Sequence, residues 1–153
     1  MRIDLSRRYY DSYDPNVWTK AGFDPKTGGY NVYHKDHNFS TIGGGGQAEK
    51  EVGAILMKLG KQVEFLSEKG HSTRHSDLYF DGQTWDVKYA ENANLENIRK
   101  KIYGASKQAD NAILFVDTNK MEMLRDAVAR SNYHKPIGVY YMQIGVVEII
   151  CLK

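Results

Sequence analysis

The segment HSDLYFDGQTWDVKYA, residues 75–90, carries two aspartates and a lysine in a pattern that could bind a metal ion. Two strand-like stretches flank an Asp-Gly dipeptide, which is favoured in two-residue hairpin turns. If this dipeptide forms the whole turn, Asp77 lies directly opposite Asp86, and two facing carboxylates repel each other. A divalent cation between them would reverse that repulsion, because Mg²⁺ takes oxygen ligands. The spacing therefore predicts a cation site, with Lys88 on the same face and able to reach a phosphate.

The two faces of this hairpin differ in polarity, because side chains alternate along a strand. The charged residues share one face, and the other is a predicted core face made of Leu78, Phe80, Trp85 and Val87. A solvated polar face is the ordinary alternative for such a pattern. The prediction depends on the register, since a three-residue loop would separate the two aspartates.

A third carboxylate could come from the helix predicted over residues 47–60. Its apolar residues recur at helical spacing, and at about 100° per residue Glu49 falls at the edge of the apolar face. Glu51 falls further to the side. A ligand above the sheet has to come from the inward edge, so we expect Glu49 to join the site. The alternative is a plain solvated glutamate.

The chain as a whole predicts a mixed α/β (α+β) domain, with a central sheet flanked by helices. Residues 1–46 show no sustained period and are expected to form an irregular arm that ends in a glycine-rich hinge. Residues 47–153 are expected to form the domain. Its predicted helices are residues 47–60, 95–110 and 121–131, and its predicted strands are residues 62–67, 76–80, 83–89, 112–117, 137–142 and 146–152.

The composition favours an ordinary globular protein, with 153 residues, 41% hydrophobic and 26% charged. No apolar run approaches the roughly 18 residues of a membrane span, so no membrane partner is expected. The N-terminal residues do not form a secretory signal. The single cysteine, Cys151, excludes an internal disulfide and a thiolate zinc cluster. These features indicate a chain made in a reducing compartment such as the cytoplasm, although another route could export it later.

The acids and the lysine resemble the motif of the PD-(D/E)xK nuclease superfamily. That family places a glutamate on a helix, an aspartate on the second strand and Asp-x-Lys on the third, which matches residues 47–117 here. Ser76 stands where the motif name has proline. The resemblance implies a restriction-endonuclease-like α-β-β-β-α-β core and phosphodiester hydrolysis. It also implies that Mg²⁺ or another divalent cation is bound by Glu49, Asp77 and Asp86, with Lys88 as the fourth catalytic residue.

Residues 86–117 are also similar to the tRNA-nuclease toxin domains of contact-dependent growth inhibition proteins, and to related domains of phage and mobile elements. The similar features are the Asp-x-Lys strand, a basic helix ending in KQAD and the apolar strand AILFVD. This resemblance implies RNA, and tRNA in particular, rather than DNA as the substrate. A toxin of this kind would require a neutralising immunity protein. A DNA endonuclease with the same site is one alternative, and a non-catalytic nucleic-acid-binding or phage structural module is another.

Basic and polar residues near the acids are candidate substrate ligands, because cationic side chains bind phosphates. They lie just before Asp77 and on the helix predicted over residues 95–110. For each of them, a solvated surface position is the alternative. The candidates are Arg74, His75, Arg99, Lys101, Lys107 and Gln108.

The segment YHKDHN contains two further histidines, His34 and His37. They could bind zinc or act as acid and base in a metal-free ribonuclease. The chain offers no regular ligand spacing for zinc, so the favoured interpretation is that both are turn residues.

Overall fold

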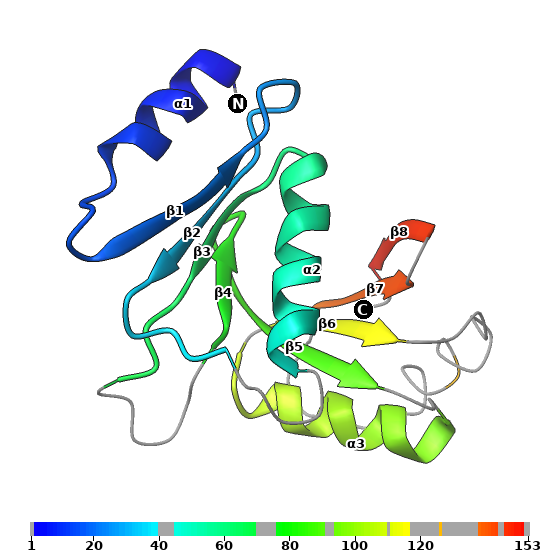
Figure 1. Ribbon diagram of the computed structural model, residues 1–153. Coiled ribbons are helices and arrows are strands. Elements are labelled where there is room, and N and C mark those ends of the chain that lie inside the picture. The colour runs from blue at the N-terminus through cyan, green and yellow to red at the C-terminus, as the bar shows by residue number, and fades with distance from the viewer. Residues whose placement is uncertain are drawn as a thin grey trace.

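The computed structural model describes residues 2–39, 45–69, 76–90, 94–109, 111–116, 126, 138–143 and 146–151. Three helices pack beside a mixed sheet of eight strands whose order in space follows their order in the chain (Figure 1). The helices are α1 (Ile3–Ser12), α2 (Gly45–Lys58) and α3 (Leu95–Ser106). The strands are β1 (Trp18–Phe23), β2 (Tyr30–His34), β3 (Gln62–Phe65), β4 (Leu78–Phe80), β5 (Gln83–Ala90), β6 (Asn111–Val116), β7 (Gly138–Gln143) and β8 (Val146–Cys151).

The strand directions confirm the predicted α+β class. Strand β3 runs parallel to β2, and β5, β6 and β7 run parallel to one another, whereas the other neighbouring pairs are antiparallel. The pairing of β7 with β8 agrees with the predicted C-terminal hairpin. Of the helix expected over residues 121–131, the structure describes only Asp126, which is helical. None of the helices among the described residues is long and apolar enough to cross a membrane.

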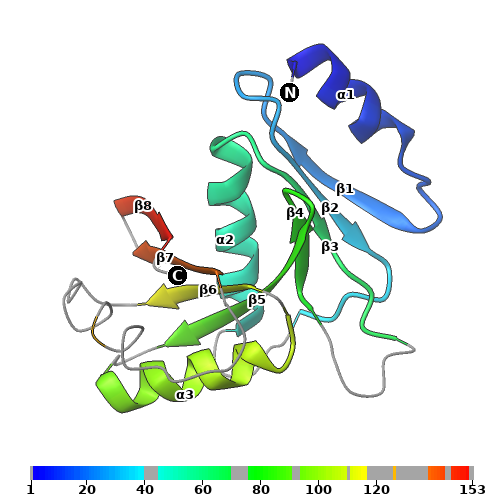
Figure 2. The same cartoon turned by 180° about the vertical axis from the view of Figure 1, so that it is seen from behind.

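The N-terminal region differs from the irregular arm that was expected, because α1, β1 and β2 are regular elements (Figure 2). Tyr10, Tyr30 and Val32 form a small core of their own. The parallel pairing of β2 with β3 joins this region to the main sheet. Helical or strand periodicity is hard to detect in such short elements, and it is tertiary pairing that orders them.

The start of α2 also differs from the expected glycine hinge. Gly45 and Gly46 belong to its first turn, although glycine is a poor helix former. Tertiary packing of the helix offsets that cost, since Val52 and Leu56 are buried against the sheet. The rest of the predicted hinge, Gly43–Gly44, lies outside the described residues.

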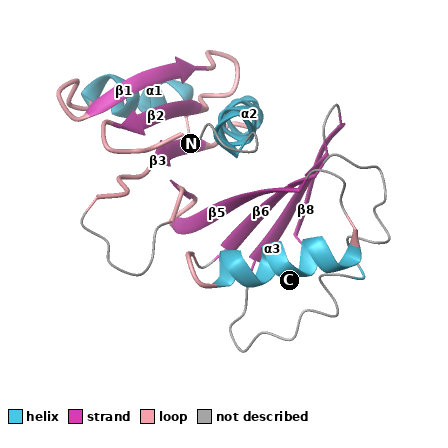
Figure 3. Ribbon diagram, turned by 60° about the horizontal axis from the view of Figure 1, so that its bottom comes forward, coloured by secondary structure: helices cyan, strands magenta, loops and turns pink. Residues whose placement is uncertain are grey.

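Two helices cover opposite faces of the sheet around β5. The apolar face of the hairpin, represented by Trp85 and Val87, packs against α2 in the main core. Lys88 points to the other face, where α3 lies along β5 and β6 (Figure 3). The four residues of the predicted core face are all buried, as expected: Leu78, Phe80, Trp85 and Val87.

The β4–β5 hairpin has the two-residue turn predicted from the Asp-Gly dipeptide. Phe80 pairs with Gln83, and the next pairs follow without a shift as far as Leu78 and Trp85. Asp81 and Gly82 have φ of 53° and 73°. Two positive values at the central positions are those of the type I′ turn, which matches the twist of the flanking strands. The register on which the site prediction depends is therefore confirmed.

We predict that Gly53→Ala lowers the free energy of unfolding by about 1–3 kcal/mol, the usual cost of overpacking a core. A Cβ at Gly53 in α2 would lie 2.6 Å from Cζ of Phe65, so helix and sheet would have to separate. Urea denaturation measures the change. The control is Gly104→Ala in α3, where the new Cβ meets nothing closer than 3.7 Å. This control should be neutral, or stabilising by up to about 1 kcal/mol, and equal losses in both variants would contradict the prediction.

Candidate active site

Asp77 and Asp86 come together where β4 and β5 leave regular pairing. The Asp77 amide donates to the Trp85 carbonyl at 2.9 Å, and its carboxylate Oδ2 accepts from the Val87 amide at 2.7 Å. The Asp77 side chain is thereby turned across to β5, beside Asp86. Asp86 is only 3% exposed. The hairpin thus brings the two acids together, as the sequence predicted, and it leaves Asp86 buried and Asp77 partly buried, which the sequence did not indicate.

The proximity of these acids is expressed in the pKa of Asp77, which is raised far above the ordinary value of 3.8. Burial is the largest cause, followed by a hydrogen bond with Asp86 and by the negative charges of Asp86 and Glu49. Without a cation, the pair therefore favours a state in which the carboxyl groups share a proton. A positive charge at this position would remove the need for that proton.

Lys88 partly compensates the charge of Asp86. Its Nζ lies 3.1 Å from Asp86 Oδ2 as an ion pair, and this buried oxygen has no hydrogen-bond partner among the residues that the structure describes. Unsatisfied buried polar atoms are uncommon and costly. The Lys88 side chain is 29% exposed, so its ammonium group can also reach solvent and a bound anion.

These side chains surround an open pocket of about 350 Å³. Gln108, in the turn that follows α3, contributes to one side of the pocket. Four of its lining residues were expected from the sequence, and Glu68, just after β3, was not. No sequence signal pointed to Glu68, because its place depends on how the chain leaves the end of β3. The lining residues are Glu68, Asp77, Asp86, Lys88 and Gln108.

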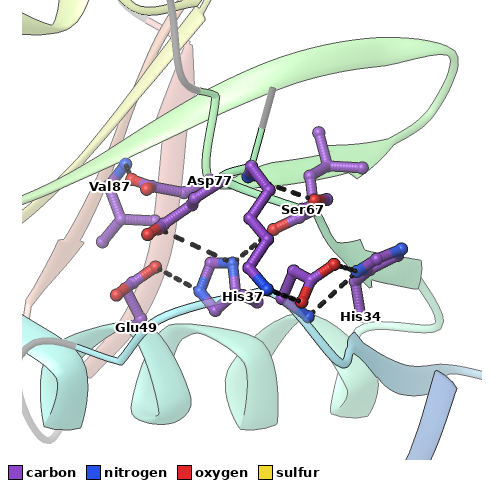
Figure 4. Close-up of polar contacts among 10 residues, drawn as sticks. His34, His37, Glu49, Ser67, Asp77 and Val87 are labelled. Atoms are coloured by element: carbon purple, nitrogen blue, oxygen red, sulfur yellow. Dashed lines mark hydrogen bonds and ion pairs between the residues drawn. The ribbon is translucent and has the colours of Figure 1, made fainter. Parts of the chain in front are cut away.

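Glu49 is buried, at 7% exposure, and is held by a histidine (Figure 4). Its Oε1 lies 3.0 Å from Nε2 of His37, whose side chain is fully buried. The other ring nitrogen of His37, Nδ1, lies 2.7 Å from the Leu66 carbonyl oxygen. Burial lowers the His37 pKa, but the hydrogen bond and charge of Glu49 outweigh that effect, so the pKa is raised. His37 is therefore part of the site's surroundings, which the interpretation as a turn residue missed.

His34 lies at the end of β2, and its Nδ1 accepts from the amide of Asp36 at 3.0 Å. Its ring packs edge-on against Trp18. This position agrees with the interpretation of His34 as a residue of the turn.

The acids fit a cation site in part. Asp77 and Asp86 supply carboxylates at the pocket, and the unbonded Asp86 Oδ2 is the kind of oxygen a cation would satisfy. Within the part of the chain that the structure describes, no three His, Cys, Asp or Glu side chains form a group that could hold a metal ion. Glu49 is near enough to influence Asp77, but its Oε1 is bonded to His37. The donor set thus suits an ion with two carboxylates and several waters, as Mg²⁺ often has.

The residues expected to bind substrate lie in different places relative to the pocket. Gln108 lines the pocket, and its backbone carbonyl accepts a hydrogen bond from the Ser76 hydroxyl at 2.8 Å. Lys101 is exposed on α3, and Lys107 follows the helix with Nζ 4.1 Å from the centre of the Tyr103 ring. Arg99 is partly buried and lines a second pocket of about 240 Å³ with Glu96, Lys100 and Tyr103. Arg74 and His75 lie outside the described residues.

Comparison with protein-family models, with curated proteins and with solved structures gave no match to this chain.

We predict that Asp77→Asn stabilises the protein without divalent cations. The folded state holds the Asp77 proton more tightly than the unfolded state does. The contribution of this group to stability is therefore fully present below its ordinary pKa of 3.8 and is lost as pH rises through the raised folded pKa. An asparagine removes that loss and keeps an acceptor for the Val87 amide. One pKa unit corresponds to about 1.4 kcal/mol, so we expect a gain on the order of 1–3 kcal/mol near pH 8.

Urea denaturation in EDTA at several pH values measures this gain. It should shrink towards pH 4, where the wild-type carboxyl is protonated in both states. The matched control is Asp81→Asn in the exposed turn of the same hairpin, whose carboxylate pairs only with Lys61 among the interactions the structure describes. A variant D77N that is less stable than the wild type at pH 8 would contradict the prediction.

Proposed function

We propose that this chain is a metal-dependent endonuclease that hydrolyses phosphodiester bonds, with RNA, and tRNA in particular, as the favoured substrate. The observation that supports it most is the pair of neighbouring carboxylates, of the partly buried Asp77 and the buried Asp86, in one pocket with the ammonium group of Lys88. Two carboxylates can hold a divalent cation, and a neighbouring ammonium group can contact the phosphate that this cation binds.

The residues of the pocket have distinct roles in this proposal. A bound divalent cation supplies positive charge that polarises the scissile phosphate and acidifies water. Asp77 and Asp86 would hold it, and Asp86 would then no longer depend on Lys88 for charge compensation. Lys88 can turn its ammonium group to the phosphate and stabilise the charge that develops there. Gln108, which follows α3 and lines the pocket, is placed to orient the substrate or a water.

The preference for RNA rests on the resemblance of residues 86–117 to tRNA-nuclease toxin domains, together with the cationic side chains of α3. The same resemblance supports a toxin-like or mobile-element role and a neutralising immunity protein. The acidic pocket itself is equally suited to a phosphodiester of DNA, because both substrates present the same phosphate group.

We expect the protein to cleave purified tRNA in Mg²⁺ and to lose this activity in EDTA. Asp86→Asn and Lys88→Met should each lower the cleavage rate by about 100-fold or more, the usual effect of removing a group that stabilises developing charge. Gel electrophoresis of tRNA and of plasmid DNA, incubated side by side with each variant, measures the rates. Faster cleavage of the plasmid would identify a DNA endonuclease instead.

The matched controls lie in the same region of the sheet and make the same charge changes away from the pocket. They are Asp81→Asn and Lys61→Met, which break only the exposed ion pair at the hairpin turn. Both should retain activity. If wild-type protein binds RNA but cleaves neither nucleic acid, the non-catalytic binding module is the correct alternative. Activity that persists in EDTA would contradict the metal-dependent mechanism.

We predict that Lys101→Ala and Lys107→Ala weaken RNA binding severalfold and reduce its dependence on salt. Each lost phosphate contact should lower the slope of log affinity against log salt by about 0.7 for a single strand. Fluorescence anisotropy with the non-cleaving variant Asp86→Asn measures affinity between low and moderate salt. Lys58→Ala, an exposed lysine of α2, is the control. Unchanged slopes in both α3 variants would show that these residues do not contact the phosphates.

A further inference from the structure

We propose that His37 is a positioning residue, which fixes the Glu49 carboxylate beside the Asp77–Asp86 pair and so makes the segment after β2 part of the active site. This inference rests on the proposed nuclease function and deepens it. It concerns a residue that contacts neither substrate nor cation, because its side chain is fully buried. His37 acts on the site through Glu49, to which its Nε2 is bonded.

The orientation of the His37 ring is fixed on all sides. Its two nitrogens bond to the Leu66 carbonyl and to Glu49 Oε1. Its ring packs edge-on against Phe39 and Phe65, with centroid distances of 4.7 and 5.4 Å. An imidazole held by two hydrogen bonds and two aromatic rings has a single orientation available, so it defines where its carboxylate partner lies.

Each of the two ring nitrogens of His37 faces an oxygen atom, and each of these contacts requires a proton between nitrogen and oxygen. A carbonyl oxygen can only accept, so Nδ1 donates to Leu66. Nε2 then faces a carboxylate, and either the ring carries both protons or Glu49 is protonated. In both cases His37 and Glu49 share a proton in a buried site. A buried charged pair of this kind is a weak source of stability, since desolvation offsets its attraction. A core position that needed only volume would be filled as well by an apolar ring.

The shared proton accounts for how Glu49 can stay near two other acids. The charge of Glu49 acts on Asp77, and without His37 it would be a third uncompensated carboxylate in the same region. Its bond to His37 offsets that charge and fixes the Oε1 atom. The carboxylate is then oriented before substrate or cation binds, which is what a precise site requires.

The same segment also reaches a pocket residue. His37 Nδ1 lies 3.9 Å from Glu68 Oε1, and the amide of Glu68 donates to the Asp36 carbonyl at 3.2 Å. Lys69 pairs with the Asp36 carboxylate at 3.1 Å. The turn that carries His37 is therefore joined to the chain on both sides of Glu68, which lines the pocket.

His37→Gln tests the proposal, since glutamine keeps a polar side chain but cannot bond to both acceptors along the same line. We expect kcat to fall by about 10- to 100-fold, the usual effect of losing a hydrogen-bonded partner around a metal site, while the KM for RNA changes less than about twofold, because α3 is untouched. The half-saturating Mg²⁺ concentration should rise by about the same factor, because Glu49 is then no longer fixed where its charge acts on Asp77, one of the two residues proposed to hold the cation. His34→Gln, a histidine of the same turn, should leave all three quantities unchanged.

The double variant His37→Gln, Glu49→Gln separates positioning from a purely structural role. If His37 acts through Glu49, adding His37→Gln to the Glu49→Gln variant lowers kcat little beyond the loss caused by Glu49→Gln alone. Losses in kcat that multiply, or an H37Q variant with wild-type kcat and Mg²⁺ dependence, would overturn the proposal.

A folding defect has its own test. If H37Q does not fold, the variant His37→Gly, which lacks the ring, is refolded in the presence of imidazole or of benzene. Benzene fills a similar space but forms no hydrogen bonds. Cleavage restored by imidazole and not by benzene supports the positioning role, and equal restoration or none overturns it.

The outcome for His37 can be distinguished from that of the nuclease proposal. If the wild type cleaves no nucleic acid but is stabilised thermally by Mn²⁺, the proposed function fails, and a smaller Mn²⁺ shift in H37Q still supports the positioning of Glu49. An equal shift overturns it. If the wild type neither cleaves nor responds to Mn²⁺, both proposals fall.

Discussion

The mutual repulsion of two neighbouring carboxylates, one buried and one partly buried, is the constraint around which this site is arranged. Asp77 and Asp86 would separate if the chain allowed it. The tight turn, the ladder as far as Leu78 and Trp85, and the hydrogen bond from the Val87 amide to Asp77 hold them together. The structure opposes the repulsion with positive charge and with shared protons: Lys88 lies against one acid, and His37 lies against the neighbouring Glu49. The folded state thus stores electrostatic strain that a cation would relieve, and stability is given up where binding needs it.

Elements from distant parts of the chain contribute to this arrangement. The hairpin supplies the two aspartates and Lys88, while α2 supplies Glu49 from the opposite face of the sheet. The segment after β2 supplies His37, and the turn after α3 supplies Gln108, which lines the pocket. The parallel pairing of β2 with β3 is essential, because it places the end of the N-terminal region level with the end of β3, where His37 meets Leu66.

The sequence predicted what local rules control. The Asp-Gly turn has strict backbone requirements, so the register of the hairpin and the meeting of Asp77 and Asp86 could be derived from spacing. The contacts of His37 and Glu68 could not, because they depend on how a turn and a strand end approach each other in space. The regular elements before residue 40 were missed for a similar reason: their order comes from pairing with β3 and from a separate aromatic cluster, not from a repeating pattern.

Phe65 contacts both the α2 helix at Gly53 and the ring of His37, so its packing affects the fold and the site together. Its ring lies close to the α2 backbone at Gly53, and it also packs edge-on against the imidazole of His37. One rigid aromatic side chain therefore sets both the distance between α2 and the sheet and the orientation of His37, the residue that bonds to Glu49 of α2. Natural variation of the core at this place would retune the acidity of the pocket without altering a single charged residue.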